Sequence, residues 1–217
     1  MFEHRHPYPP FLFPGMEKLI VGTLPPPRFS TGALKAGDVH FCYGSKDGLL
    51  WPILDRIFDL GLVYEDSQYA ITQREHFLKS RKIGVCDIVS KAYRTKIDAS
   101  DLGMQKAELR DVLGVLREYQ SIKRILFTGG NSKNGPEYFF RKQLKLAGNN
   151  LEVVSNDIPR IHRFTLDDRV VETVSLTAPS GSANRAIGSM AAYKKAKALD
   201  SNFNTLDFRV DQYRPYF

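Results

Sequence analysis

A carboxylate directly after a short apolar run is the first feature of this sequence that could do chemistry. The run is residues 83–86 of the stretch KIGVCDIVSKAYR, and Asp87 follows it. Burying an ionised carboxylate is costly, so such a group must be solvated, paired or functional. Once ionised, it only accepts hydrogen bonds. Asp87 is therefore a candidate for chemistry, and the structural alternatives are a turn cap or an ion pair with Lys91 or Arg94.

The stretch KLIVGTLPPP, residues 18–27, predicts a second part of a site. Its apolar run of Leu19, Ile20 and Val21 is typical of a strand covered on both faces. Gly22 ends the run, and the prolines that follow cannot continue a ladder because proline lacks the backbone N–H. Open α/β sheets bind ligands at the carboxyl ends of their strands. We therefore expect the loop after Val21 to line a ligand site.

Apolar spacing elsewhere predicts strands that alternate with helices. Further strands are expected at 83–86, at 125–128 and in one or both of the segments 151–157 and 169–177. Helices are expected at 49–60, around 74–80, from a cap at Ser100 or Asp101 to about 120, at 136–148 and at 184–199. Such alternation implies mostly parallel pairing with right-handed crossovers. The loops after Val21, Val85 and Leu176 are then expected to converge on one edge of the sheet.

The composition is that of an ordinary globular protein, with 42% hydrophobic and 25% charged residues. A chain of 217 residues suits one domain, here residues 1–217 with an extended arm at 1–16 and a C-terminal tail at 200–217. No apolar run reaches the ~18 residues of a membrane span. Two cysteines are too few for a disulfide framework, which fits a reducing, cytoplasmic setting. The histidines and cysteines lack metal-site spacing, so we expect no metal.

The charge of the chain favours a polyanionic partner. The formal net charge is +7 and the pI is about 9.4. A basic balance of this kind is typical of nucleic-acid-binding proteins. Many basic proteins bind nothing anionic, so charge alone supports the two interpretations equally.

Three segments, taken in order, resemble motifs of the uracil-DNA glycosylase superfamily. GTLPPP at 22–27 is similar to its Gly-x-Asx-Pro-Gly or Gly-Gln-Asp-Pro loop. HFCYGSKDGLLWPIL at 40–54 resembles the aromatic, Trp-containing segment of its mismatch-specific members, and TAPSGSANRA at 177–186 resembles the small-residue motif before its last helix. A weaker match at 84–109 resembles its Gly-Ile-Thr-Asn-Leu-Val stretch. The mismatch-specific and hypoxanthine-type branches look nearest.

The resemblance implies an α/β fold, a three-layer α/β/α sandwich whose central, mostly parallel sheet has four strands, with DNA bound across the strand ends. Members of the superfamily extrude a nucleotide from the stack and cleave its N-glycosidic bond. They use a positioned water and stabilising charge, without a metal or another cofactor in catalysis. The branch with an iron–sulfur cluster needs four cysteines, whereas this chain has two. The resemblance therefore implies a monomeric DNA glycosylase that removes uracil or hypoxanthine from damaged or mismatched DNA.

One departure from the superfamily motifs shifts the expected catalytic residue. Where the first motif carries the Asp or Asn that positions water, this chain has Leu24. The amides of Gly22 and Thr23 can still line the pocket, and the Thr23 hydroxyl can hold a water. Asp87 falls where many members carry the Asn that reads the base edge, so we expect Asp87 to activate water or to stabilise the cationic sugar. Two further carboxylates are lesser candidates that also suit helix capping: Asp98 and Asp101.

The resemblance also implies a base pocket formed by the first loop and the aromatic segment. The predicted pocket residues are Gly22, Leu24, Pro25, Phe41, Tyr43 and Gly44. Phe41 and Tyr43 are candidates to stack on a flipped base, because stacking adds roughly 1–3 kcal/mol per base. Core packing is the alternative for both, and it is the expected role of Trp51. His40 is expected either to contact a phosphate or to be structural.

The loop before the last predicted helix is expected to grip the DNA backbone. The predicted DNA contacts are Ser180, Gly181, Ser182, Asn184 and Arg185. Hydroxyls bond phosphates, and a helix that begins at Asn184 offers free N–H groups. The structural alternative is a loop of small residues chosen for a tight turn. Asn131 and Lys133, after the third strand, are weaker candidates for phosphate contact.

The sequence therefore supports three candidate functions. The leading one is a metal-independent DNA glycosylase. The second is a catalytically silent DNA-binding protein of the same fold, which Leu24 favours. The third is an enzyme acting on free nucleotides, which is less favoured because the chain has neither a P-loop nor a GxGxxG fingerprint.

Overall fold

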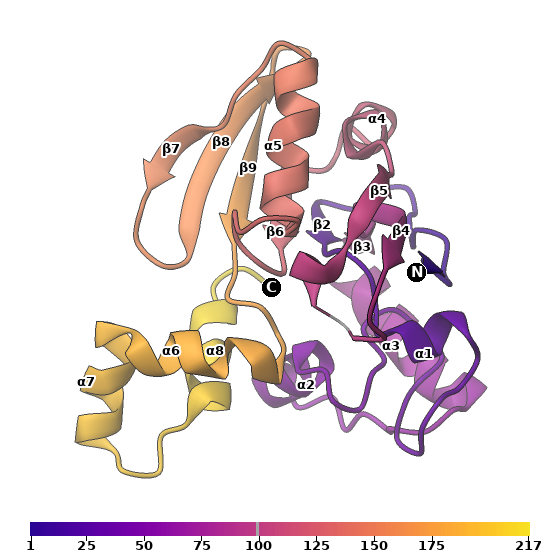
Figure 1. Ribbon diagram of the computed structural model, residues 1–217. Coiled ribbons are helices and arrows are strands. Elements are labelled where there is room, and N and C mark those ends of the chain that lie inside the picture. Colours follow the sequence, from indigo (N-terminus) through magenta and orange to yellow (C-terminus); the bar gives the residue numbers. More distant parts are fainter. Residues whose placement is uncertain (99) are drawn as a thin grey trace.

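Six strands form the central sheet in the order β3-β2-β6-β9-β8-β7 (Figure 1). The computed structural model describes residues 1–98 and 100–217. The strands are β2 (Lys18–Val21), β3 (Ile83–Val85), β6 (Arg124–Phe127), β7 (Glu152–Ser155), β8 (Arg160–Leu166) and β9 (Arg169–Ser175). The strands β3, β2, β6 and β9 pair in parallel, whereas β8 and β7 pair antiparallel. The sheet is therefore mostly parallel.

The sheet is larger than the four strands that the resemblance predicts. Its four parallel strands include the apolar runs singled out in the sequence, and two antiparallel strands extend it at one edge. Strand β8 was not expected, because its sequence RIHRFTL is rich in polar residues. Buried and exposed side chains alternate along its second half, and it pairs with β9 over the whole length of both strands. Cross-strand pairing therefore adds a hairpin that composition does not reveal.

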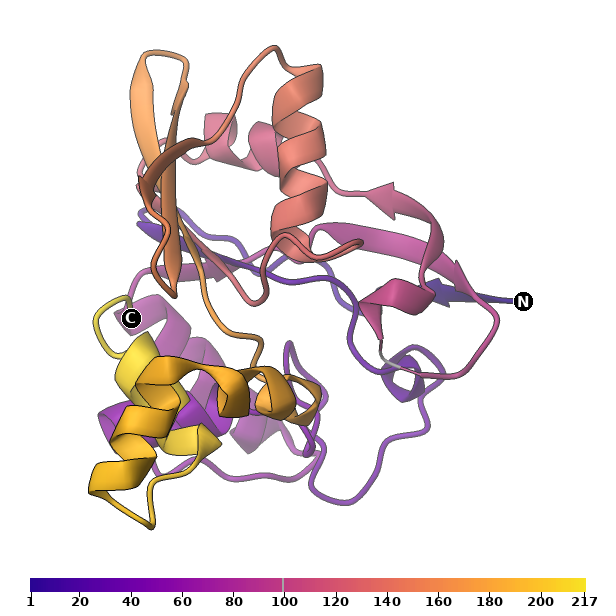
Figure 2. The same ribbon diagram turned by 60° about the vertical axis from the view of Figure 1, so that its left-hand side comes forward.

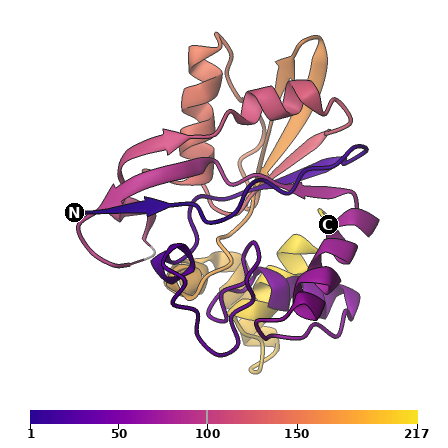
Figure 3. The ribbon, with the colours of Figure 1, turned by 90° about the vertical axis from the view of Figure 1, so that its right-hand side faces the viewer.

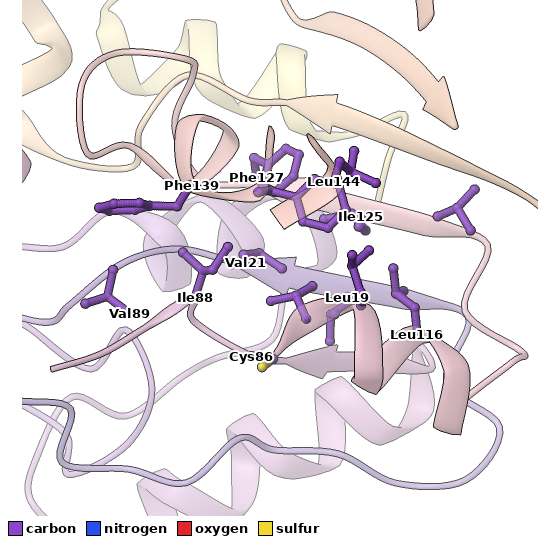
Figure 4. Packing of buried hydrophobic residues seen from close by; sticks show 14 of the residues in the cluster. Leu19, Val21, Cys86, Ile88, Val89, Leu116, Ile125, Phe127, Phe139 and Leu144 are labelled. Atoms are coloured by element: carbon purple, nitrogen blue, oxygen red, sulfur yellow. The ribbon is translucent and has the colours of Figure 1, made fainter. Parts of the chain in front are cut away.

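Helices cover both faces of the sheet, as the predicted three layers require. Leu19 and Val21 belong to a buried cluster with residues of α4 (Val112–Glu118) and α5 (Pro136–Leu146), shown in Figure 4. The intervening Ile20 belongs to a second cluster with α2 (Leu50–Phe58), α3 (Gln68–Ser80) and α8 (Thr205–Tyr213). Successive strand residues point to opposite faces, so β2 contributes to both clusters.

A second sheet, which was not predicted, has the order β1-β4-β5 and is antiparallel (Figure 3). Its strands are β1 (Phe2–Arg5), β4 (Val89–Arg94) and β5 (Gln105–Leu109). The prediction of one helix starting at Ser100 or Asp101 is wrong. Pairing with β4 overrides the helix-forming residues of β5, and α4 begins only at Val112, where the Asp111 side chain accepts the Gly114 N–H at 2.8 Å.

His4 in β1 makes the stability of this second sheet sensitive to acid. It is fully buried, and its Nδ1 accepts a hydrogen bond from Arg94 Nε at 2.8 Å. Burial, together with the neighbouring Arg94 charge, lowers the pKa of His4 to about 4. The unfolded chain, with a His pKa of about 6.5, binds the proton more readily. Stability from this group is therefore full above pH 6.5 and is lost as the pH falls toward 4.

We expect the free energy of unfolding to fall by roughly 2 kcal/mol through His4 alone between pH 7 and pH 4.5. Urea unfolding of the wild-type protein and of His4→Asn at both pH values isolates this term, because Asn keeps an acceptor for Arg94 but does not titrate. The variant should lose less stability on acidification. Equal losses in the two proteins would show that His4 does not contribute.

Three helices, in gold and yellow in Figure 2, follow the last strand of the sheet. The predicted single helix at 184–199 is instead α6 (Asn184–Ser189) and α7 (Ala191–Leu199), which are separated by an extended Met190. Gly188 and Ser189 are weaker helix formers than the alanines of α7 and precede the break. The tail left unplaced by the sequence contains α8, which Asn204 and Asp207 cap reciprocally.

The remaining helical segments are short: α1 (Pro27–Ser30) and the 3₁₀ turns η1 (Asp101–Gly103) and η2 (Gly181–Ala183). Across the described ranges, we find no helix with the length and apolar character needed to cross a bilayer.

Candidate active site

Three parallel strands end next to one another and bring Gly22, Asp87 and Thr128 together. Gly22 follows β2, Thr128 follows β6, and Asp87 lies just beyond β3. Asp87 Oδ1 accepts the Gly22 N–H and the Tyr43 hydroxyl, each at 2.7 Å. The same hydroxyl lies 3.2 Å from Thr128 Oγ1. The loops after Val21 and Val85 therefore meet at one edge of the sheet, as predicted.

His6, in the N-terminal segment, contacts the other oxygen of Asp87 and was missed by the sequence analysis. Its Nε2 lies 3.0 Å from Asp87 Oδ2, and its side chain is 2% exposed. Its Nδ1 lies 2.9 Å from the Tyr8 carbonyl oxygen and 3.2 Å from the Tyr8 nitrogen. Because an ionised carboxylate only accepts hydrogen bonds, His6 Nε2 is the donor to Asp87 Oδ2. Pairing of β1 with β4 brings residue 6 close to residue 87, and no short-range pattern signals it.

The ion pairs first considered for Asp87 are formed by other residues. Lys91 lies 2.5 Å from Glu108, and Arg94 donates to His4 and lies 3.4 Å from Asp98. Asp98 also accepts the Ser100 N–H at 3.1 Å and so stabilises its own turn. The Asp87 carboxylate instead bonds with His6, Gly22 and Tyr43.

Arg110 stabilises the backbone on either side of this network, and the sequence did not reveal its role. Its guanidinium donates to the Tyr8 carbonyl oxygen at 2.6 Å and to the Asp87 carbonyl oxygen at 3.2 Å. The Asp87 carboxylate is buried and accepts three hydrogen bonds. A carboxylate has about four acceptor positions, so within the described part of the chain one position of Asp87 accepts no hydrogen bond.

Gly22 allows these side chains to approach the backbone closely. A Cβ built at Gly22 would lie 2.8 Å from both Asp87 Oδ1 and Thr128 Oγ1, and would also contact the Tyr43 hydroxyl. We expect Gly22→Ala to lower the free energy of unfolding by ~1–3 kcal/mol, as overpacking typically does. Urea unfolding tests this. The control is Gly181→Ala, where nothing lies within 4 Å of an added Cβ. Equal stability of the two variants would contradict the close approach.

Tyr43 occupies an unusual backbone conformation to reach Asp87. Its φ is 57°, in the left-handed region that non-glycine residues rarely adopt. Burial and the neighbouring Asp87 charge raise the pKa of the Tyr43 phenol. The hydroxyl therefore stays protonated and donates a hydrogen bond to the carboxylate. Strained conformations of this kind cluster at functional sites.

Asp101, a lesser candidate, lies on the other side of the first loop. Its Oδ1 accepts the Thr23 hydroxyl at 2.6 Å, so the Thr23 proton is already committed. Burial raises the pKa of Asp101. The turn that carries Asp101 is held by Asn134, whose side-chain amide donates to the carbonyl oxygens of Asp101 and Met104 at 3.0 and 2.9 Å. Asn134 was also missed, although it lies in the predicted loop beside the exposed Asn131 and Lys133.

The other predicted pocket residues are mostly packed inside the protein. Leu24 belongs to the first buried cluster, and Phe41 packs between Phe11 and Trp51 in the second. Gly44 closes the turn at 39–44, where a side chain would collide with the Val39 carbonyl oxygen. Pro25 is half-buried, and His40 is exposed with its ring against Tyr8. The structure thus brings Tyr43, rather than Phe41, to Asp87.

The predicted DNA-binding loop is held by a buried arginine that the sequence did not single out. Ser180 and Ser182 bond each other through their hydroxyls at 2.8 Å, and Arg185 is exposed. Arg209 of α8 is fully buried and donates to the carbonyl oxygens of Ala178, Ser180 and Thr205 and to Asn184 Oδ1. The loop also contacts the segment after Tyr43, because the Leu49 N–H donates to the Pro179 carbonyl oxygen at 2.8 Å.

The helix that begins at Asn184 has only six residues and follows a 3₁₀ turn. The expectation that its free N–H groups contact a phosphate stays a prediction.

Two surface hollows lie elsewhere, one of about 440 Å³ beside α2 and one of about 350 Å³ between α4 and α5. Neither is lined by a predicted site residue. Among residues 1–98 and 100–217, no group of three or more His, Cys, Asp or Glu side chains is arranged to hold a metal ion.

Comparison with known proteins supports the fold class that these features define. No family model and no curated protein matches the chain. A solved structure does match: the solution NMR structure of a proposed uracil DNA glycosylase from Methanosarcina acetivorans. The match covers 97% of this chain and 99% of that one, with a TM-score of 0.54 and 17% sequence identity. The chain therefore has a uracil-DNA glycosylase-like α/β fold.

Proposed function

We propose that this protein is a DNA glycosylase that cleaves the N-glycosidic bond of a flipped-out deaminated base, uracil or hypoxanthine. The observation that carries the proposal is the Asp87 carboxylate, held at the carboxyl edge of the parallel strands by Gly22, Tyr43 and His6. Active sites of open α/β sheets lie at this edge. The solved structure with the same fold is described as a proposed uracil DNA glycosylase, which supports the same reaction class.

In the proposed reaction the C1′–N bond breaks and its electron pair leaves with the base. The oxygen of a water molecule then bonds C1′, and Asp87 accepts a proton from that water. The negative charge of Asp87 also stabilises the positive charge that develops on the sugar. The Tyr43 hydroxyl and the Gly22 N–H fix the carboxylate, so little reorganisation accompanies the reaction.

The substrate is proposed to be DNA rather than a free nucleotide. The net charge of +7 suits a polyanion, and the loop at 178–185 presents hydroxyls and the exposed Arg185. Binding that weakens steeply with salt is the expected signature of several phosphate contacts. A flat salt response would favour the small-molecule interpretation.

The test is base release from labelled duplexes that each carry one uracil, hypoxanthine, xanthine or mismatched thymine. With protein in excess, alkaline cleavage of the abasic site reports each event. We expect scission of the uracil or hypoxanthine duplex. No scission of any duplex would reject the glycosylase.

A second candidate is a catalytically silent DNA-binding protein of the same fold. Leu24 favours it, because a buried leucine occupies the place where the superfamily motif carries a water-positioning residue. Salt-sensitive binding without scission of any duplex would select this candidate.

A further inference from the structure

A cluster of charged side chains lies where β8 and β9 meet the start of α5. Glu137 is fully buried and accepts the Ser175 hydroxyl at 2.7 Å. The Arg141 guanidinium lies 2.8 Å from Glu137 Oε1, and Arg160 Nη2 lies 3.2 Å from Oε2. One carboxylate thus faces two guanidinium groups.

The charge of this cluster is not balanced within it. Hydrogen bonds from Ser175 and Arg141, with the nearby arginine charges, outweigh burial and lower the pKa of Glu137, which stays ionised. Burial lowers the pKa of His162, which lies 3.0 Å from Arg141 Nη2 and stays neutral at pH 7. One negative and two positive groups leave an excess of one positive charge, which suits an anionic ligand.

Arg160 is the member of the cluster whose guanidinium makes the fewest hydrogen bonds. Its side chain is 39% exposed, and Nη2 to Glu137 is the one hydrogen bond that it donates within the described part of the chain. Arg141 by contrast contacts both Glu137 and His162. The buried carboxylate fixes one edge of the Arg160 guanidinium, so its other N–H groups remain available to a phosphate.

Arg160 also lies beside the loop that carries Thr128 of the candidate active site. It pairs in register with Ser175, at the carboxyl end of β9. Its Nη2 is 2.9 Å from the position that a Cβ of Gly130 would take, and Gly130 follows Thr128 by two residues. Thr128 contacts Tyr43, which bonds Asp87.

We propose that Arg160 binds a backbone phosphate of DNA beside the extruded nucleotide, with Glu137 as the residue that positions it. This inference rests on DNA being the substrate of the proposed function, and it adds a contact that the sequence motifs do not include. The hairpin β7–β8 that extends the sheet would then serve to deliver Arg160 to the strand ends.

The test is the binding of an undamaged duplex, followed by fluorescence anisotropy over a range of salt concentrations. Arg160→Gln is expected to weaken binding about 3- to 10-fold at 0.1 M salt and to reduce the salt slope by about 1. The matched control is Arg163→Gln on the same strand, because Arg163 is exposed and pairs with Glu152 away from the cluster. It should bind within about twofold of the wild-type protein, as a residue without a phosphate contact does.

Equal binding by the two variants, or no duplex binding by the wild-type protein, would overturn the inference. Base release is measured separately with the same proteins. If only Arg160→Gln binds the duplex more weakly and the wild-type protein releases no base, the phosphate contact is supported and the glycosylase is rejected. If the wild-type protein releases base and both variants bind the duplex equally well, the glycosylase is supported and the phosphate contact is rejected.

Discussion

Asp87→Asn is expected to lower the single-turnover rate of base release by roughly 10²- to 10⁴-fold, the usual contribution of a general base. Asn keeps an oxygen that can accept from the Gly22 N–H and from Tyr43, so the loop should stay in place. What it loses is the charge and the basicity that the proposed reaction needs. Affinity for undamaged duplex should change little, because Asp87 is buried and contacts no predicted phosphate ligand.

The matched control is Asp98→Asn, since Asp98 is an exposed carboxylate that stabilises a turn. Its rate should stay within a few-fold of wild type. Comparable rates for Asp87→Asn and the wild-type protein would remove Asp87 from catalysis. A large loss in Asp98→Asn with Asp87→Asn unaffected would point to Asp98 instead.

Arg209→Met is expected to lower the free energy of unfolding by about 3 kcal/mol, which reflects the loss of hydrogen bonds from a charged group at about 1.5–3 kcal/mol each, offset by no longer burying its charge. The substitution removes the side-chain donor of three carbonyl oxygens and of Asn184 Oδ1. The Ala178 and Ser180 oxygens keep one backbone donor each, the N–H groups of Ser180 and Ala183. Because these acceptors hold the loop at 178–184, duplex binding should weaken as well.

Urea unfolding measures the loss, with Arg214→Met as the control at an exposed position near the end of the same helix. Arg214→Met should change the stability by less than about 0.5 kcal/mol, as surface substitutions do. Unchanged stability in Arg209→Met would mean that the cost of burying its charge cancels its hydrogen bonds.

The parts of the fold that could be predicted are those with a local signal. The apolar runs of β2, β3 and β6 and the helical spacing of α2 and α5 are read from neighbouring residues. Strands β4, β5 and β8 carry mixed or helix-favouring sequences and are stable only because a partner strand pairs with them. Such pairing depends on residues far away in the chain, so no local pattern announces it.

The residues of the candidate site also differ in whether a local sequence signal identifies them. Asp87 stands out because a carboxylate after an apolar run is rare, and Gly22 because it ends a strand before prolines. His6, Arg110, Asn134 and Arg209 were missed because each acts on a segment between 29 and 102 residues away, through contacts that only the folded chain creates. Phe41 and Tyr43 are alike in type and two positions apart in the same loop, and only the turn at 39–44 decides which one reaches Asp87.

The most direct test of the central claim is chromatographic detection of the free base after the protein meets a duplex with one labelled uracil or hypoxanthine. We expect the wild-type protein to release labelled free base in an amount equal to the abasic sites formed, and Asp87→Asn to release a strongly reduced amount. A wild-type protein that binds these duplexes and releases no base from either would contradict it.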